Sequence, residues 1–480
     1  RSDTVPPVLG LDSDGDGLED FIELLIGGDP MSRLRVGDRV DLHLAAYAGD
    51  GRSVRLFGKL PPGLRFDAAT GRLTGVLGGV STLHDLQVQV LENGALVRTA
   101  VLPLAVDAFP ARLLGSYEAL LEGEGAQPLG LMRVTVTQSG QWSASLDLLG
   151  AGRRSAKGGY ELVAGRRQAR LRMPFKASKT VPETWVEVIL DADQPQMTGE
   201  FSGAPQAGEV RGVRLATLGG SPPVTRRLNL AFDAGIQDGL AHPAGVGWAK
   251  GSISNRGALK LAGFLGDGTK LTLGVNLSAT GQALAWVQPY KNKQSYFGGV
   301  LPLPDLGQPA PQLPALVEGA RWFKAADAKD KAYPAGFTAP LTVVVTARGY
   351  ASPATSQQLA EALGLEGARL RIELEGAGLS NAPEALPSLP NALVLQPSFA
   401  LVAEAPVGAA PWTGKVAKAD GAFSGVLILP ASGDILGGKA AASGVLLPEP
   451  VGNVIGAGFV RVPLANPRGS FRTASFLLQR

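Results

Sequence analysis

Apolar and polar residues alternate along most of this chain, as they do in half-buried β-strands. The stretches 40–47 ("VDLHLAAY") and 84–106 ("HDLQVQVLENGALVRTAVLPLAV") show this alternation first. Within the second stretch, Asn93 and Gly94 form a dipeptide that strongly predicts a two-residue hairpin turn. The pattern therefore predicts antiparallel β-sheet.

One hairpin form recurs later in the chain. It consists of a strand pattern, a polar turn that ends in glycine, and a second strand pattern that begins with an apolar residue. It occurs in three stretches, each with its own glycine: 134–148 (Gly140), 251–265 (Gly257) and 415–429 (Gly421). A further hairpin is predicted at 271–287. Such meandering hairpins build barrels or broad sandwiches, and the pattern leaves both open.

Two segments interrupt this pattern. Residues 355–367 ("TSQQLAEALGLEG") predict a short helix that is capped at Thr355 or Ser356 and closed by Gly364. Five prolines within residues 302–314 indicate a semi-rigid linker, and we place a domain boundary there.

The composition favours an all-β, multidomain protein. A chain of 480 residues is too long for one core, and its 64 Gly and 35 Pro divide it into short segments joined by turns. It contains no Cys, which excludes disulfides, thiolate nucleophiles and Cys-ligated metal sites. This fits an exported bacterial protein or one from a reduced compartment. The formal net charge of +3 is too small to indicate a nucleic-acid partner.

The location of the protein is inferred from two further features. No run of residues approaches the roughly 18 apolar residues that a membrane-spanning helix needs, so we expect no transmembrane segment. The chain begins with Arg1 rather than Met, as a mature exported protein or a trimmed one would. We expect a secreted protein or one on the bacterial cell surface.

The acidic stretch 11–30 ("LDSDGDGLEDFIELLIGGDP") matches the calcium-loop pattern D-x-[DN]-x-[DN]-G-x5-E. Alternate residues of such a tightly wound loop point inward and can surround one Ca²⁺ ion, and the glycine permits the sharp turn. The alternative is a solvated acidic turn that caps a helix. The predicted calcium ligands are the carboxylates of Asp12, Asp14, Asp16, Asp20 and Glu23 and the backbone carbonyl of Leu18.

This stretch also resembles the bacterial thrombospondin type 3-like repeat, which pairs such a loop with a short helix and a closing Gly-x-Asp-Pro. The closing residues here are Gly27, Gly28, Asp29 and Pro30. Those repeats usually occur in tandem, whereas this chain has a single copy. We expect calcium to have a structural role and no catalytic one.

Residues 60–79 ("LPPGLRFDAATGRLTGVLGG") resemble the bacterial putative Ig-like family of small extracellular β-sandwiches, which is related to cadherin-like modules. The resemblance covers about residues 33–108. Leu64, Phe66 and Leu73 are predicted to face the core, and residues 67–71 to form a tight turn. Residues 321–337 and 444–464 are similar to repeats in large secreted proteins of verrucomicrobial-type bacteria.

These observations predict four parts. They are a calcium-binding loop and helix (1–31), an Ig-like β-sandwich (32–108), an antiparallel barrel or sandwich (109–305) and a second β-rich domain with one short helix (306–480).

No catalytic residues are predicted. The histidines His43, His84 and His242 are scattered, and the chain has neither a nucleophile elbow nor a zinc-protease motif. Two distant carboxylates, as in a glycosidase, would leave no local signature. We expect no enzymatic activity.

Two groups of residues could bind a ligand. Arg170 and Arg172 alternate with apolar residues, so one strand face is predicted to be cationic. This face could contact an anionic glycan, lipopolysaccharide, nucleic acid or an acidic patch on a neighbouring subunit. The alternative, which the pattern favours, is a solvated strand face. Trp286, Tyr290 and Tyr296 are the best candidates for exposed aromatics that stack on sugars. The full set of basic candidates is Arg153, Arg154, Arg166, Arg167, Arg170 and Arg172.

Two functions follow. The first is a calcium-stabilised structural or adhesive protein of the cell surface. It would associate with itself or with other surface proteins, and its strand edges could pair into a filament or layer. The alternative is a carbohydrate-binding or accessory protein of a polysaccharide-degrading system.

Overall fold

The protein is all-β with very little helix, as the sequence predicts. The computed structural model describes residues 34–48, 51–79, 82–163, 167–177, 181–203, 206–216, 226–236, 239–303, 319–365, 367, 369–377, 379, 392–404, 412–448 and 452–480. The chain divides into two compact units. Unit 1 comprises Arg1–Gly123, Met132–Asp147 and Arg153–Arg214, and unit 2 comprises Glu124–Leu131, Leu148–Gly152 and Leu215–Arg480. In the part of the chain that is described, no helix is long and apolar enough to cross a membrane.

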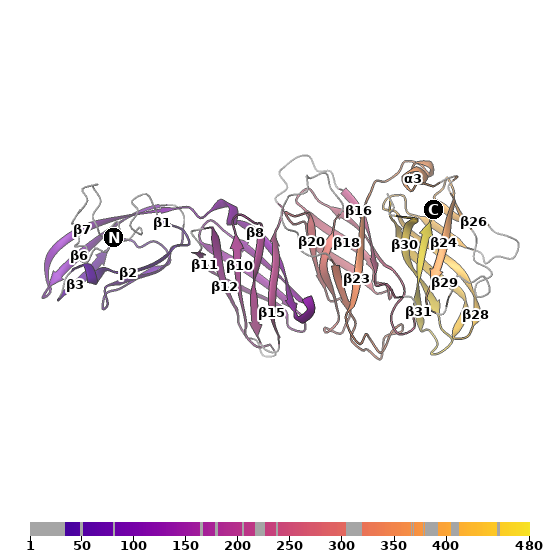
Figure 1. The fold of residues 1–480 in the computed structure, drawn as a ribbon, viewed down its shortest axis with the longest axis horizontal. Coiled ribbons are helices and arrows are strands. Elements are labelled where there is room, and N and C mark those ends of the chain that lie inside the picture. Colours follow the sequence, from indigo (N-terminus) through magenta and orange to yellow (C-terminus); the bar gives the residue numbers. More distant parts are fainter. Residues whose placement is uncertain are drawn as a thin grey trace. The chain divides into compact units, whose positions relative to one another are not determined.

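Unit 1 begins with a small domain of two sheets, which have the strand orders β1-β7-β6-β3 and β2-β5-β4. Its elements are β1 (Leu34–Arg35), β2 (Arg39–His43), α2 (Leu44–Ala48), β3 (Arg52–Phe57), β4 (Leu64–Asp67), β5 (Arg72–Val76), β6 (Thr82–Glu92) and β7 (Ala95–Asp107). Strands β6 and β7 form a long hairpin (Figure 1). The predicted turn is confirmed, because Asn93 and Gly94 have φ values of 50° and 83°.

The sequence pattern is confirmed in part within this domain. Leu64 and Leu73 are buried and Phe66 is half-buried. The strand predicted at 40–47 ends at His43, and the chain continues as the short helix α2. Leu44 and Ala48, four residues apart, are both buried, which is the spacing of one helix face.

The next sheet is a closed barrel with the order β10-β11-β12-β13-β14-β15-β8-β9. An eight-stranded barrel is just wide enough for side chains to fill it, and residues such as Leu171 and Met173 are fully buried. Two short 3-10 helices, η1 (Ala111–Leu113) and η2 (Glu124–Ala126), precede and follow β8. The strands are β8 (Gly115–Gly123), β9 (Gln127–Val136), β10 (Gln141–Leu148), β11 (Gly152–Val163), β12 (Gln168–Phe175), β13 (Thr184–Asp191), β14 (Gln196–Gly203) and β15 (Gln206–Arg214).

Unit 2 contains an eight-stranded antiparallel sheet with the order β19-β18-β17-β16-β23-β22-β21-β20. Its end strands β19 and β20 are joined by the isolated bridge between Leu277 and Ala283. The strands are β16 (Arg226–Asp233), β17 (Gly247–Ile253), β18 (Ala258–Phe264), β19 (Lys270–Asn276), β20 (Gln282–Val287), β21 (Tyr296–Pro302), β22 (Gly319–Phe323) and β23 (Leu341–Tyr350). Strands β21 and β22 pair with each other, so the boundary predicted at 302–314 falls between two paired strands of one sheet.

Unit 2 ends in a second closed barrel, which has the order β24-β25-β26-β27-β28-β29-β30-β31. The predicted helix before it is confirmed as α3 (Ser356–Ala362), and Thr355 is its cap: the Thr355 side chain accepts a hydrogen bond from the Gln358 N–H. The strands are β24 (Arg369–Glu375), β25 (Ala392–Leu395), β26 (Ala400–Glu404), β27 (Thr413–Val416), β28 (Ala422–Ser432), β29 (Ile435–Leu446), β30 (Val454–Pro463) and β31 (Phe471–Gln479).

The three recurring hairpins are confirmed, and each belongs to a different eight-stranded sheet. They are β9–β10, β17–β18 and β27–β28. Their turn glycines Gly140, Gly257 and Gly421 have φ values of 79°, 77° and 70°. Only glycine adopts this left-handed backbone without a steric cost, which explains why glycine recurs there.

Within unit 2 the sheet packs against the second barrel. Trp248 and Phe459 belong to one shared buried apolar cluster. The indole of Trp248 donates to the Ser443 hydroxyl (3.2 Å), and the Asn229 amide donates to the Leu446 carbonyl (2.8 Å). These hydrogen bonds offset the cost of removing the two polar groups from water.

Candidate functional site

The predicted calcium loop lies outside the described residues. This applies to all of its ligands, Asp12, Asp14, Asp16, Leu18, Asp20 and Glu23. Calcium binding therefore stays a prediction. Over the part of the chain that the structure covers, no group of three or more His, Cys, Asp or Glu residues is arranged to hold a metal ion.

The predicted cationic strand is β12 of the first barrel. Arg170 and Arg172 point outward, while Leu171 and Met173 fill the interior. Both arginines contact one carboxylate on the neighbouring strand: Glu187 lies 3.3 Å from Arg170 Nε and 2.9 Å from Arg172 Nε. Glu187 therefore partly neutralises this face.

The other basic candidates make contacts within the same barrel. Arg154 donates to the Thr184 hydroxyl (2.8 Å) and the Pro182 carbonyl (3.0 Å), and burial lowers the pKa of its guanidinium. Arg153 donates to the Ser145 hydroxyl at 3.4 Å. Arg167 lies 3.5 Å from Asp193, and Arg166 is outside the described residues. An anionic ligand at this strand would compete with these internal partners.

The prediction of exposed aromatics is wrong. Trp286 and Tyr296 are buried, with their rings stacked 5.3 Å apart. Trp286 lies over Gly298, where an added Cβ would come within 2.7 Å of the indole. The sequence signal that was missed is this glycine, because a side chain missing from one strand makes room for a tryptophan on its neighbour.

Tyr290 belongs to a buried charged network that the sequence did not reveal. Lys324 Nζ lies 2.9 Å from a carboxylate oxygen of Asp267 and 2.9 Å from one of Asp330. The Tyr290 hydroxyl donates to Asp267 (2.9 Å) and accepts from the Trp322 indole (2.9 Å). The Lys324 and Asp267 side chains are 2% and 0% exposed, so the charges have to balance each other in a low-dielectric interior.

The pKa values in this network follow from the same contacts. Burial and the neighbouring Asp267 raise the pKa of Tyr290 well above its ordinary value. Burial alone would raise the pKa of Asp330, but hydrogen bonds from the Tyr333 N–H and from Lys324 outweigh it and leave that pKa below its ordinary value. The members of this network are hydrogen-bonded to one another, which suits a structural role in holding the neighbouring segments together.

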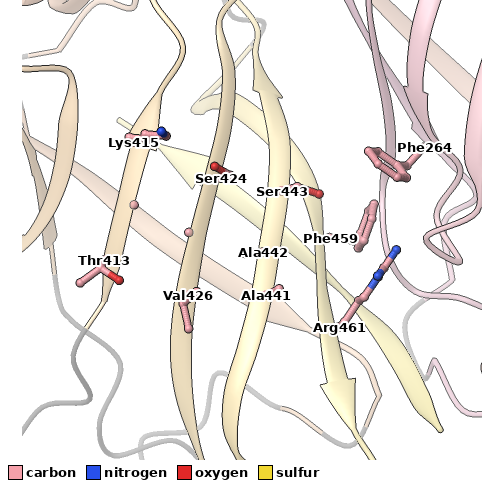
Figure 2. A pocket seen from close by; sticks show the side chains of 12 residues that line it. Phe264, Thr413, Lys415, Ser424, Val426, Ala441, Ala442, Ser443, Phe459 and Arg461 are labelled. Carbon is pink, nitrogen blue, oxygen red and sulfur yellow. The ribbon is translucent and has the colours of Figure 1, made fainter. Parts of the chain in front are cut away.

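A groove of about 590 Å³ runs over the outer wall of the second barrel. Figure 2 shows Lys415 on one side and Phe264, Phe459 and Arg461 on the other. Between them the wall carries only small side chains: Ser424, Val426, Ala441 and Ser443. The groove exists because β28 and β29 carry these short side chains, whereas Lys415 on β27 and Phe459 on β30 are longer and stand on either side.

Three features of this groove suit a polar ligand with an apolar face. The aromatic rings of Phe264 and Phe459 lie 6.1 Å apart and form part of one wall. The hydroxyls of Ser424 and Ser443 lie in the floor. Lys415 and Arg461 give the lining a positive charge, and the lining contains no carboxylate.

Comparisons with known proteins add little to this description of the sites. No family model matches the chain, and no curated protein matches it. Among solved structures, the crystal structure of the isotype 1 transferrin binding protein B (TbpB) from serogroup B Neisseria meningitidis is similar over 93% of this chain and 89% of that chain. The sequence identity is 10% and the TM-score is 0.21, a likeness that carries no conclusion about fold or function.

Proposed function

We propose that this chain is a structural or adhesive protein of the bacterial cell surface. In this proposal it has no enzymatic activity, it is stabilised by calcium at its N-terminal loop, and it associates with further copies of itself into a filament or layer. Fold alone does not imply function, so the argument rests on the surface that the sheets present.

The observation that carries the proposal is the outer edge of β7 in the small domain of unit 1, considered over the described residues. One side of β7 pairs with β6, and on its other side β1 reaches only Val106 and Asp107. Among the described residues, no strand pairs with that outer edge near Leu96 and Val97. These side chains are 58% and 49% exposed, and being neighbours on a strand they lie on opposite faces.

An open edge with apolar side chains is a template for pairing with another chain. The two closed barrels offer no such edge, because every strand in a closed sheet has two neighbours. The tip of the β6–β7 hairpin is therefore the place where we expect copies to associate.

The test is light scattering after size-exclusion chromatography, with negative-stain imaging, in millimolar calcium and again with a chelator. We expect ordered polymers in calcium that are lost in chelator and in the variant Val97→Lys, because lysine on an edge strand opposes pairing. The matched control is Val344→Lys: Val344 is 66% exposed, but its strand β23 has a partner on both sides. A monomer that is indifferent to calcium would contradict the proposal.

The alternative function, carbohydrate binding, is favoured by the groove of Figure 2. The small side chains of its floor leave room for a sugar ring, and its aromatic wall provides a surface for that ring. In the same experiment, a calcium-indifferent monomer that is retarded on a polysaccharide column would favour this alternative.

A further inference from the structure

A second cavity in unit 2, of about 550 Å³, has a strongly basic lining. It lies among three segments, 240–242, 328–338 and 464–472. Four permanent cations and one histidine line it, and Asp330 is the only acidic residue among them. The basic residues are His242, Lys329, Lys331, Arg468 and Arg472.

Asp330 does not neutralise these cations, because its carboxylate is already engaged. One oxygen lies 2.9 Å from Lys324, and the other accepts hydrogen bonds from the Ala332 N–H (2.9 Å) and the Tyr333 N–H (2.8 Å). Lys324 with its two carboxylates carries a single net negative charge behind the cavity. The four lining cations outnumber it.

The lining cations themselves have few anionic partners. Of the residues that the structure describes, none places a carboxylate within 4.0 Å of Lys329, Lys331 or Arg468. Arg472 lies 3.8 Å from Asp434, whose side chain is 81% exposed, and such a surface contact contributes little. The cavity therefore has an uncompensated positive potential that favours an anion.

The cations are carried by an ordered framework. The Phe337 N–H donates to the Lys324 carbonyl (2.7 Å), and the Phe471 N–H donates to the Lys331 carbonyl (3.2 Å). The Tyr333 hydroxyl lies 3.2 Å from that of Thr473, which ties the 328–338 segment to β31. Preorganisation of this kind lowers the entropy cost of binding.

We propose that this cavity binds a glycan substituted with sulfate or phosphate groups. The cations supply charge-assisted hydrogen bonds to the oxyanions, and arginine does so in a bidentate geometry. Leu240, which is 53% exposed, and Pro334 and Pro467 provide aliphatic surface for the sugar rings. The volume lies within the range of small-ligand cavities.

The same lining does not favour single-stranded nucleic acid. Recognition of unpaired bases depends on exposed aromatic rings on which the bases stack. The one tyrosine of this lining, Tyr333, is only 4% exposed and uses its hydroxyl internally. A glycan is therefore the occupant that the chemistry favours.

Binding of such a glycan would name the class of ligand for the adhesive role proposed above, so its biological meaning rests on that proposed function. The binding test itself does not depend on that function. Calorimetry on the full chain measures binding whether or not the protein assembles, and the β7 variant Val97→Lys can serve as a monomeric background.

The experiment titrates the full chain with a sulfated heparin tetrasaccharide, its desulfated form, sodium sulfate and a DNA duplex of equal charge. We expect the sulfated sugar to bind more tightly than the other three ligands. Its affinity should decrease as the salt concentration rises. Replacing Lys331→Gln and Arg468→Gln together should weaken this binding by about tenfold or more. The matched control, Lys260→Gln with Lys270→Gln, removes the same charge from exposed positions on β18 and β19 and should change it by less than about twofold.

Three outcomes would overturn the proposal. They are no binding of the sulfated sugar at millimolar concentration, equal losses in both double variants, and equal affinity for the DNA duplex. Circular dichroism of each variant establishes that it is folded before the titration is interpreted.

Discussion

At the scale of single residues, two glycines of the stretch 60–79 are required by close backbone contacts. A Cβ on Gly63 would lie 2.0 Å from the Val76 carbonyl oxygen, and one on Gly75 would lie 2.1 Å from the Gly63 carbonyl oxygen. Both residues also have positive φ values, of 90° and 143°. These two glycines therefore let β4 and β5 approach each other at their paired ends.

We predict that Gly75→Ala destabilises unit 1 by about 3 kcal/mol, from strain and overpacking together. The control is Gly51→Ala: Gly51 has φ +76° but no described atom within 4 Å of an added Cβ. That change should cost about 1 kcal/mol, the conformational part alone. Urea unfolding followed by circular dichroism measures both. Equal losses of unfolding free energy in the two variants would show that the close contact at Gly75 relaxes without an energetic cost.

Residue-level predictions succeeded where the pattern was local. Alternation placed Leu64 and Leu73 in the core correctly, because burial on a strand follows a period of two. The prediction that Trp286 is exposed was wrong, because the exposure of a large ring depends on the neighbouring strand. Gly298 makes room for that ring, and strand register is set by pairing between segments that the local pattern does not show.

At the scale of elements, the segment after β22 is held in place by a buried ion network. Lys324 directly follows that strand, and its two carboxylate partners come from a turn 57 residues earlier and from the segment itself. No sequence pattern links Lys324 to Asp267, because the two meet only through sheet pairing. The hairpins and α3 were predicted from local signals, whereas this network could not be.

We predict that Lys324→Met destabilises unit 2 by about 3 kcal/mol at neutral pH, because Asp267 and Asp330 lose their shared cation. In the wild type the pKa of Asp330 is lower when folded than when unfolded. Its contribution is therefore present above the unfolded value of about 3.9 and is lost as the pH falls through the folded value.

Chemical denaturation from pH 7 to pH 3 tests this. The difference in unfolding free energy between wild type and Lys324→Met should shrink in acid as Asp330 becomes protonated. The exposed neighbour Lys329 provides the control, and Lys329→Met should leave the unfolding midpoint nearly unchanged. A variant difference that stayed constant across this range would exclude the ion network as its cause.

At the scale of the whole molecule, the chain combines a small two-sheet domain with three eight-stranded sheets, in two compact units. The all-β class followed from composition and alternation. The boundaries between the sheets could not be predicted from composition and alternation. The prolines at 302–314 are typical of a linker between domains, but β21 and β22, which lie on either side of them in sequence, pair in one sheet. Proline-rich composition predicts an interruption of regular structure, but it does not predict where the chain pairs again.

The last prediction concerns how stability is divided between the units. Unit 2 has extensive cores of its own, and Gly75 and Lys324 belong to different units. Substitutions at distant sites that share no contacting residues have additive effects on the free energy of unfolding. Calorimetry should therefore show two transitions, of which Gly75→Ala lowers only one and Lys324→Met only the other, each by about 6–12 °C for a loss of about 3 kcal/mol. In the double variant both transitions should move by the amounts seen in the single variants. A single transition that moves with either change would mean that the units unfold together.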